Sequence, residues 1–262
     1  MKIPRSKKAH IDCETNTSGL ILSIINENEL EFTAEQIFAL SQLTWYDKGI
    51  SKLRALNTIY KKDYDDISDF LKDDEISDQT KEYISKGTGY TNLYRVYRNS
   101  SFKWIQENLP TVQNIIELAL DERINDKSRL RIASLIDRLP GISKPNSKIG
   151  KMSPASLLSP LIICLDKENR FPIINKASAV VDLYRKLKIS NLSVPEQVHE
   201  LLKILDNIDI NNAFELDVMS RTVINMVTPV YQKKKIEREQ VNEIGRGLLD
   251  KDDDDVEYFV KT

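Results

Sequence analysis

The sequence predicts an all-α fold, and three observations support this prediction. Apolar residues recur at helical spacing through most of the 262 residues. Only 8 glycines and 9 prolines interrupt the chain, too few for a protein of many short strands and turns. No segment alternates apolar and polar residues between turn dipeptides. With 40% hydrophobic and 30% charged residues, the composition is that of a globular protein with a buried core.

The first helices are predicted from apolar spacing and from capping residues. We expect residues 1–17 to form a flexible polar arm, with a first helix beginning at Ser18. Thr33, followed three residues later by Gln36, is a capping box that predicts a helix from Ala34. Later segments with helical spacing predict further helices, at 50–60, 64–71, 77–84, 91–109, 111–124 and 129–139.

The second half begins with an N-terminal helix signal. Ser153 is a favourable N-cap, and Pro154 then takes the first helical position, where proline is tolerated. Cys164 lies in the apolar segment that follows, and we interpret it as a buried small hydrophobe. More helices are expected at 176–189, 194–205, 211–227 and 230–249.

These elements suggest two helical parts, 18–125 and 126–249, followed by an acidic tail at 250–262. The chain has two cysteines, no signal-peptide pattern and no apolar run long enough to cross a bilayer. We therefore expect a cytoplasmic protein without a membrane partner. No cofactor is expected, because no phosphate-binding glycine motif is present, and two isolated histidines give no zinc site.

Charge is distributed unevenly along the chain. Residues 127–188 contain 13 Lys or Arg and 4 Asp or Glu, a net of +9, within a chain whose total is −2. The remaining residues must then carry −11. Such a separation is typical of a nucleic-acid footprint, although basic and acidic faces can also satisfy each other within the fold.

The segment "LPGISKPNSKIGKMSPASLL" at 139–158 combines three prolines, two glycines and three lysines between two helices. Glycines allow close backbone approach, and the amides at a helix N-terminus bind anions. This pattern predicts a helix-hairpin-helix that grips phosphates, while a connector without a ligand is the alternative. The expected phosphate contacts are Gly141, Ile142, Ser143, Lys144, Lys148, Gly150, Lys151 and Ser153.

Residues 129–190 resemble the helix-hairpin-helix DNA glycosylases of the endonuclease III/MutY type. Leu139, Pro140 and Gly141 match the hairpin, and the "FPII" at 171–174 matches the approach to the catalytic aspartate. Asn175 stands in the place of that aspartate, and the family's iron–sulfur cysteines are missing. The resemblance implies a non-catalytic DNA-binding subunit of a repair, restriction or phage-defence assembly, with Asn175 and Lys176 near the DNA.

Aromatic and basic residues alternate in "GYTNLYRVYRNSSFKW" at 89–104, where Arg95, Arg98 and Lys103 are further candidate DNA contacts. An amphipathic core helix is the alternative there. Two other functions stay open. One is an active glycosylase or nuclease that uses Asp137, Asp166 or Asp182, and the other is a protein–protein adaptor that binds through its charged faces and the "VEYFV" tail.

Overall fold

The chain is all-α, as the sequence predicts. The computed structural model describes residues 5–46, 49–91, 93, 95–143, 150–174, 189–207, 210 and 212–219. For residues 5–7, 95, 96 and 190 only the backbone is described. Within these ranges the extended pairings are two isolated β-bridges, Trp45 with Thr91 and Ile142 with Met152.

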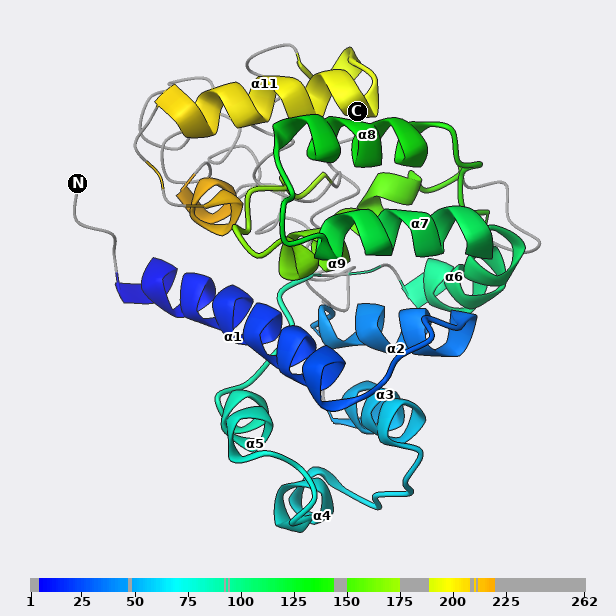
Figure 1. Ribbon diagram of the computed structural model, residues 1–262, viewed down its shortest axis with the longest axis vertical. Helices are drawn as coiled ribbons and strands as arrows, with labels where there is room; N and C mark the ends of the chain where they lie inside the picture. The colour runs from blue at the N-terminus through cyan, green and yellow to red at the C-terminus, as the bar shows by residue number, and fades with distance from the viewer. Residues whose placement is uncertain are drawn as a thin grey trace, which may run out of the picture.

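The helices follow one another closely along the chain (Figure 1). Residues 213–219 are also helical. The elements are α1 (Arg5–Glu27), α2 (Ala34–Leu43), α3 (Ile50–Tyr60), α4 (Ile67–Lys72), α5 (Asp78–Ser85), α6 (Arg95–Glu107), α7 (Leu109–Leu120), α8 (Asp126–Asp137), α9 (Pro154–Leu165), the 3-10 helix η1 (Ile189–Asn191) and α11 (Val194–Asn207).

Helix α9 is the centre of the fold. Every one of its residues except Ser156 is buried, and it contacts α1, α2, α7 and α8. Its sequence explains this position, because a helix that is apolar all round has no face suited to solvent. Helices α8 and α11 pack together at one end of the long axis of the molecule, and α4 lies at the other (Figure 1).

Several helix starts confirm the capping predictions. The Thr33 hydroxyl accepts from the Gln36 amide, and the Gln36 side chain accepts from the Thr33 amide at 3.1 Å. Ser153 caps α9 by accepting from the Ala155 amide at 3.3 Å. Helix α3 spans the predicted residues 50–60. The start of α8 was missed, however: the Asn125 side chain caps this helix from Asp126, three residues before the predicted start at 129.

The expected flexible arm is wrong from Arg5 onward, because helix α1 already begins there and continues to Glu27. Ser18 is no helix start: it lies inside α1 and its hydroxyl donates to the Cys164 carbonyl at 3.1 Å. Polar contacts hold the first half of α1. The Thr17 hydroxyl accepts from the Gly89 amide at 3.0 Å, and the Cys13 thiol donates to the Gly89 carbonyl at 3.1 Å. Apolar periodicity has no means of detecting such contacts.

Gly89 belongs to a tight turn that packs against both α1 and the end of α2. Its φ is +99°, and a Cβ at this position would lie 2.1 Å from the Trp45 carbonyl oxygen. The Thr44 backbone carbonyl accepts hydrogen bonds from the amides of Tyr90 and Thr91, at 2.9 and 2.8 Å. These bonds attach the turn to the chain just after α2. Only glycine combines this backbone conformation with so close an approach.

Side chains from both expected parts, 18–125 and 126–249, enter one continuous core. Cys164 is fully buried in it, as predicted, and burial raises the pKa of its thiol to about 12. In the described residues no helix is both long and apolar enough to cross a membrane. Residues 176–188 of the helix predicted at 176–189, the helix predicted at 230–249 and the acidic tail at 250–262 lie outside the described residues.

Candidate nucleic-acid interface

The hairpin between α8 and α9 is attached to α6 through both of its described strands. Ile142 and Met152 pair across the hairpin, each amide donating to the carbonyl of the other at 2.9 Å. The Trp104 indole N–H donates to the Pro140 carbonyl at 2.8 Å, and the Tyr97 hydroxyl donates to the Gly150 carbonyl. The two segments expected to contact DNA, one on α6 and one in the hairpin, therefore lie side by side.

The expected backbone grip is wrong for Ile142 and for the start of α9. Ile142 is completely buried, and its amide is already bonded to Met152. At the start of α9, Pro154 has no N–H, the Ala155 amide bonds to the Ser153 hydroxyl, and the Ser156 amide bonds to the Ser153 carbonyl at 3.0 Å. Residues 154–156 therefore offer no free backbone amide to an anion.

Gly141 has a packing role within the hairpin, and its predicted approach to a phosphate stays a prediction. A Cβ built on it would lie 2.8 Å from the Cβ of Lys151, which stands on the opposite strand of the hairpin. The missing side chain at Gly141 therefore leaves room for the stem of Lys151. Gly150, in contrast, faces open space, and nothing would meet a Cβ there within 4 Å.

Some of the remaining predicted hairpin contacts reach the surface, and others lie outside the described residues. Ser143, Gly150 and Lys151 are exposed, and Ser153 is half-buried. Lys151 makes no ion pair or hydrogen bond with the part of the chain that the structure describes. The predicted contacts Lys144, Lys148, Asn175 and Lys176 lie outside the described residues.

The basic residues predicted on α6 do not form one exposed surface. Arg98 is half-buried, with its guanidinium carbon 5.3 Å from the centre of the Trp45 ring. Lys103 is exposed and lies 3.7 Å from Glu107 on the same helix. The Arg95 side chain is outside the described residues. The aromatic residues Tyr97 and Trp104 are buried, so they support the fold and offer no stacking surface.

A row of basic side chains on α8 was missed in the sequence. Lys127, Arg131 and Arg138 are all exposed, and none forms an ion pair within the described part of the chain. Their spacing of i, i+4 and i+11 places them on one face, opposite the buried Ile132 and Ile136. At 1.5 Å per residue the row is about 16 Å long. The spacing itself was the signal that could have revealed it.

The described basic residues of 127–188 fall into two groups, those that bind other groups of the protein and those that do not. Arg129 and Arg170 bind carboxylates of the protein itself, Arg129 in the interior and Arg170 at the surface. Lys167 donates to the Glu122 carbonyl. The other described basic residues of this stretch are exposed and free of such partners, namely Lys127, Arg131, Arg138 and Lys151.

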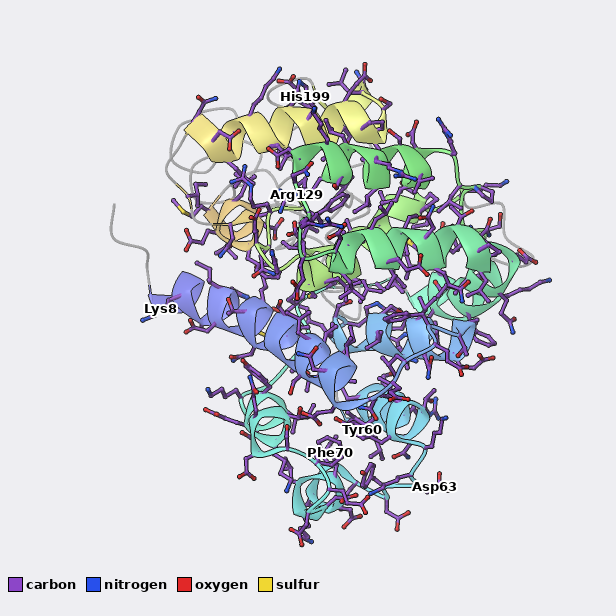
Figure 2. All side chains as sticks on the ribbon, in the orientation of Figure 1. Lys8, Tyr60, Asp63, Phe70, Arg129 and His199 are labelled. Atoms are coloured by element: carbon purple, nitrogen blue, oxygen red, sulfur yellow. The ribbon has the colours of Figure 1, made fainter. Side chains whose placement is uncertain are left out.

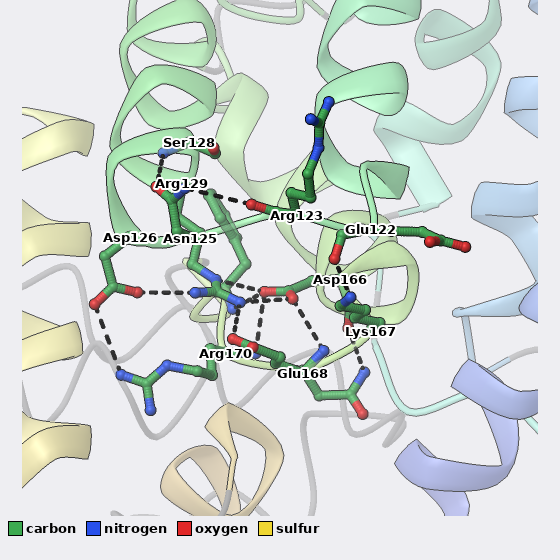
Figure 3. Close-up of polar contacts among 12 residues, drawn as sticks. Glu122, Arg123, Asn125, Asp126, Ser128, Arg129, Asp166, Lys167, Glu168 and Arg170 are labelled. Atoms are coloured by element: carbon green, nitrogen blue, oxygen red, sulfur yellow. Dashed lines mark hydrogen bonds and ion pairs between the residues drawn. The ribbon is translucent and has the colours of Figure 1, made fainter.

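Arg129 and Asp166 form the buried ionic centre of this half of the molecule (Figure 3). Two N–H groups of Arg129 bind the two oxygens of Asp166, at 2.7 and 2.8 Å. Asp126 and Glu168 accept further bonds from the same guanidinium, at 2.8 and 2.7 Å. Burial works to lower the pKa of Arg129, but the hydrogen bond and charge of Asp166 outweigh it and raise the pKa. Figure 2 shows Arg129 inside the molecule, whereas His199 lies on the outer side of α11.

The network removes Asp166 as a candidate catalytic acid. Besides Arg129, its carboxylate accepts from the amides of Glu168, Arg170 and Phe171, at 3.1, 3.1 and 2.9 Å. It is completely buried, so no substrate can reach it. Asp137 is exposed, and its carboxylate accepts from the Val194 amide at the start of α11 at 3.1 Å. Asp182 lies outside the described residues.

No family model, curated protein or solved structure matches this chain. Within the described ranges, no group of three His, Cys, Asp or Glu residues is arranged to hold a metal ion. The resemblance of residues 129–190 to the glycosylases therefore stays a prediction. A functional assignment has to come from the surface chemistry of the hairpin and of α8.

Proposed function

We propose that this protein binds DNA through basic side chains on α8 and on the adjoining hairpin. The row formed by Lys127, Arg131 and Arg138 is the observation that carries the proposal. Arg138 is the C-cap of α8, immediately before the hairpin that carries Lys151. In the described part of residues 127–188, the exposed basic residues thus continue from α8 toward the hairpin.

The binding groups in this proposal are basic side chains, not backbone amides. The row lies on one helix, so the backbone positions that carry its charges keep a fixed spacing. DNA presents closely spaced phosphates, and each phosphate neutralised by Lys or Arg releases condensed counterions. Because the four basic residues have no carboxylate partner in the described structure, binding a phosphate breaks no ion pair there. Such contacts hold the DNA backbone and carry no sequence information.

A conventional glycosylase reaction is not part of the proposal. Asp166 is committed to Arg129, and Asn175 replaces the aspartate of the family that the chain resembles. An amide cannot act as the carboxylate that this chemistry requires. Membership of a repair, restriction or phage-defence assembly stays a prediction that follows from the resemblance alone.

The test compares two variants with the same loss of charge. In the first, Lys127, Arg131 and Arg138 are each replaced by Gln. In the second, the control, Gln replaces Arg54, Lys61 and Lys72, which are exposed around α3 and α4. Fluorescence anisotropy with a labelled DNA duplex at low salt measures the affinity of each protein.

The α8 variant should bind at least about 10-fold more weakly than the wild type, since each lost phosphate contact removes a counterion-release contribution. The control variant should bind nearly as well as the wild type. Equal weakening of both variants would show that only total charge matters, and absence of binding by the wild type would favour a protein–protein adaptor.

A further inference from the structure

We infer that Tyr97 is a positioning residue for Lys151, and that Lys151 is the best-oriented DNA contact in the described part of the hairpin. The inference rests on the proposed DNA-binding function. It assigns a role to a buried tyrosine on α6 that does not itself reach the DNA.

Lys151 stands between two fixed points. The carbonyl of Gly150, just before it, accepts from the Tyr97 hydroxyl. Met152, just after it, exchanges two hydrogen bonds of 2.9 Å with Ile142. Tyr97 and Ile142 are both buried, at 5% and 0% exposure, so both anchors belong to the core. The backbone of Lys151 is thus fixed on both sides, although the residue itself is exposed.

The Lys151 stem also packs against the opposite strand. It lies over Gly141 on the opposite strand, close enough that a Cβ at Gly141 would come within 3.2 Å of the Lys151 Cδ. On that strand, Trp104 binds the carbonyl of Pro140, the residue before Gly141. Two side chains of α6, seven residues apart, therefore bind the strand that carries Lys151 and the strand over which its stem lies.

This support distinguishes Lys151 from Lys127, which is also exposed but stands on the open face of α8. A long side chain loses conformational entropy when it binds, and a side chain that is already restricted loses less. Removal of Lys151 should therefore weaken DNA binding more than removal of Lys127. Loss of the Tyr97 hydroxyl should weaken binding although every positive charge remains.

The experiment uses Tyr97→Phe, with Tyr64→Phe as its matched control. Tyr64, between α3 and α4, is similarly buried, at 7% exposure, and its hydroxyl donates to Asp73, the C-cap of α4, at 2.9 Å. Amide hydrogen exchange at Met152 reports on the hairpin directly and needs no DNA. Duplex affinity by anisotropy, measured for both variants and for Lys151→Gln and Lys127→Gln, reports on binding.

We expect Tyr97→Phe to accelerate exchange at Met152 and to weaken duplex binding by about 2- to 10-fold, the range for one net hydrogen bond. Tyr64→Phe should change neither, and Lys151→Gln should weaken binding more than Lys127→Gln. Unchanged exchange, or faster exchange with unchanged affinity, would overturn the positioning role. If the wild type binds no DNA, the proposed function fails first, and the exchange result still shows whether Tyr97 holds the hairpin.

Discussion

Arg129 and Asp166, 37 residues apart in the chain, form a two-pronged ion pair with exposures of 1% and 0%. The pair joins α8 to the end of α9. The Asp166 carboxylate also accepts hydrogen bonds from backbone amides of the following chain, as far as Phe171. It thereby fixes the helix that carries the basic row to the central helix of the core. This pair supports the candidate DNA surface without belonging to it.

Replacement of Arg129 by Met should strongly destabilise the protein. The change keeps an apolar stem but leaves Asp166 buried without its counter-charge, and breaking a buried pair in this way costs about 3–5 kcal/mol. Arg123→Met is the control, because Arg123 is exposed and lies 3.7 Å from Asp121. Its effect should stay within about 0.5 kcal/mol. Urea unfolding measures both, and similar losses for the two variants would contradict a structural role for the buried pair.

Glu27 predicts a loss of stability in acid. Partial burial works to raise the pKa of Glu27, but hydrogen bonds from Ser77, Thr80, Ser23 and Tyr60 outweigh it and hold the pKa below its ordinary value of 4.5. A lowered folded-state pKa means that the ionised form stabilises the fold. This contribution is complete above about pH 4.5 and is lost as the pH falls through the folded-state value.

Glu27→Gln should therefore flatten the pH dependence of the free energy of unfolding below about pH 4.5. At neutral pH the variant should be less stable than the wild type, because a neutral amide is a weaker acceptor for the surrounding hydroxyl groups. Glu29→Gln, at an exposed position two residues on, should leave the acid profile unchanged. Denaturant titrations between pH 3 and 7 on all three proteins test this, and parallel profiles for wild type and Glu27→Gln would refute it.

Two glycines of one turn should respond differently to alanine. Gly87 and Gly89 both have positive φ, +83° and +99°, but a Cβ meets nothing within 4 Å at Gly87 and lies 2.1 Å from the Trp45 carbonyl oxygen at Gly89. Gly87→Ala should cost about 1–2 kcal/mol, the price of the left-handed conformation alone. Gly89→Ala should cost distinctly more, since the backbone of Trp45 has to move. Thermal unfolding of both variants measures the two losses of stability. Equal losses would contradict the close approach of Gly89 to the Trp45 carbonyl.

Local signals in the sequence predicted much of the fold. Thr33 with Gln36 and Ser153 with Pro154 gave correct helix starts, because a capping side chain acts within three residues of its own position. The buried state of Cys164 also followed from its apolar neighbours. Helix α1 was missed before Ser18, because it is held there by polar contacts to a turn more than 70 residues away.

The candidate site was harder to predict for the same physical reason. The pairing of Ile142 with Met152 and the contacts of Tyr97 and Trp104 with the hairpin are long-range, so the sequence did not show that these backbone groups are already used. The sequence gives the net charge of residues 127–188 but not which of its basic residues reach the surface. Only the fold shows that Arg129 is internal while Lys127 and Arg131 face outward.

The salt dependence of duplex DNA affinity tests the central claim most directly. For wild type, and for the variant with Gln at positions 127, 131 and 138, the logarithm of the binding constant is measured against the logarithm of salt concentration. Each neutralised phosphate contributes about −0.9 to this slope, so the variant should lose about 2 to 3 from its magnitude. The same slope in both proteins, or no binding by the wild type at about 50 mM salt, would contradict DNA binding by α8.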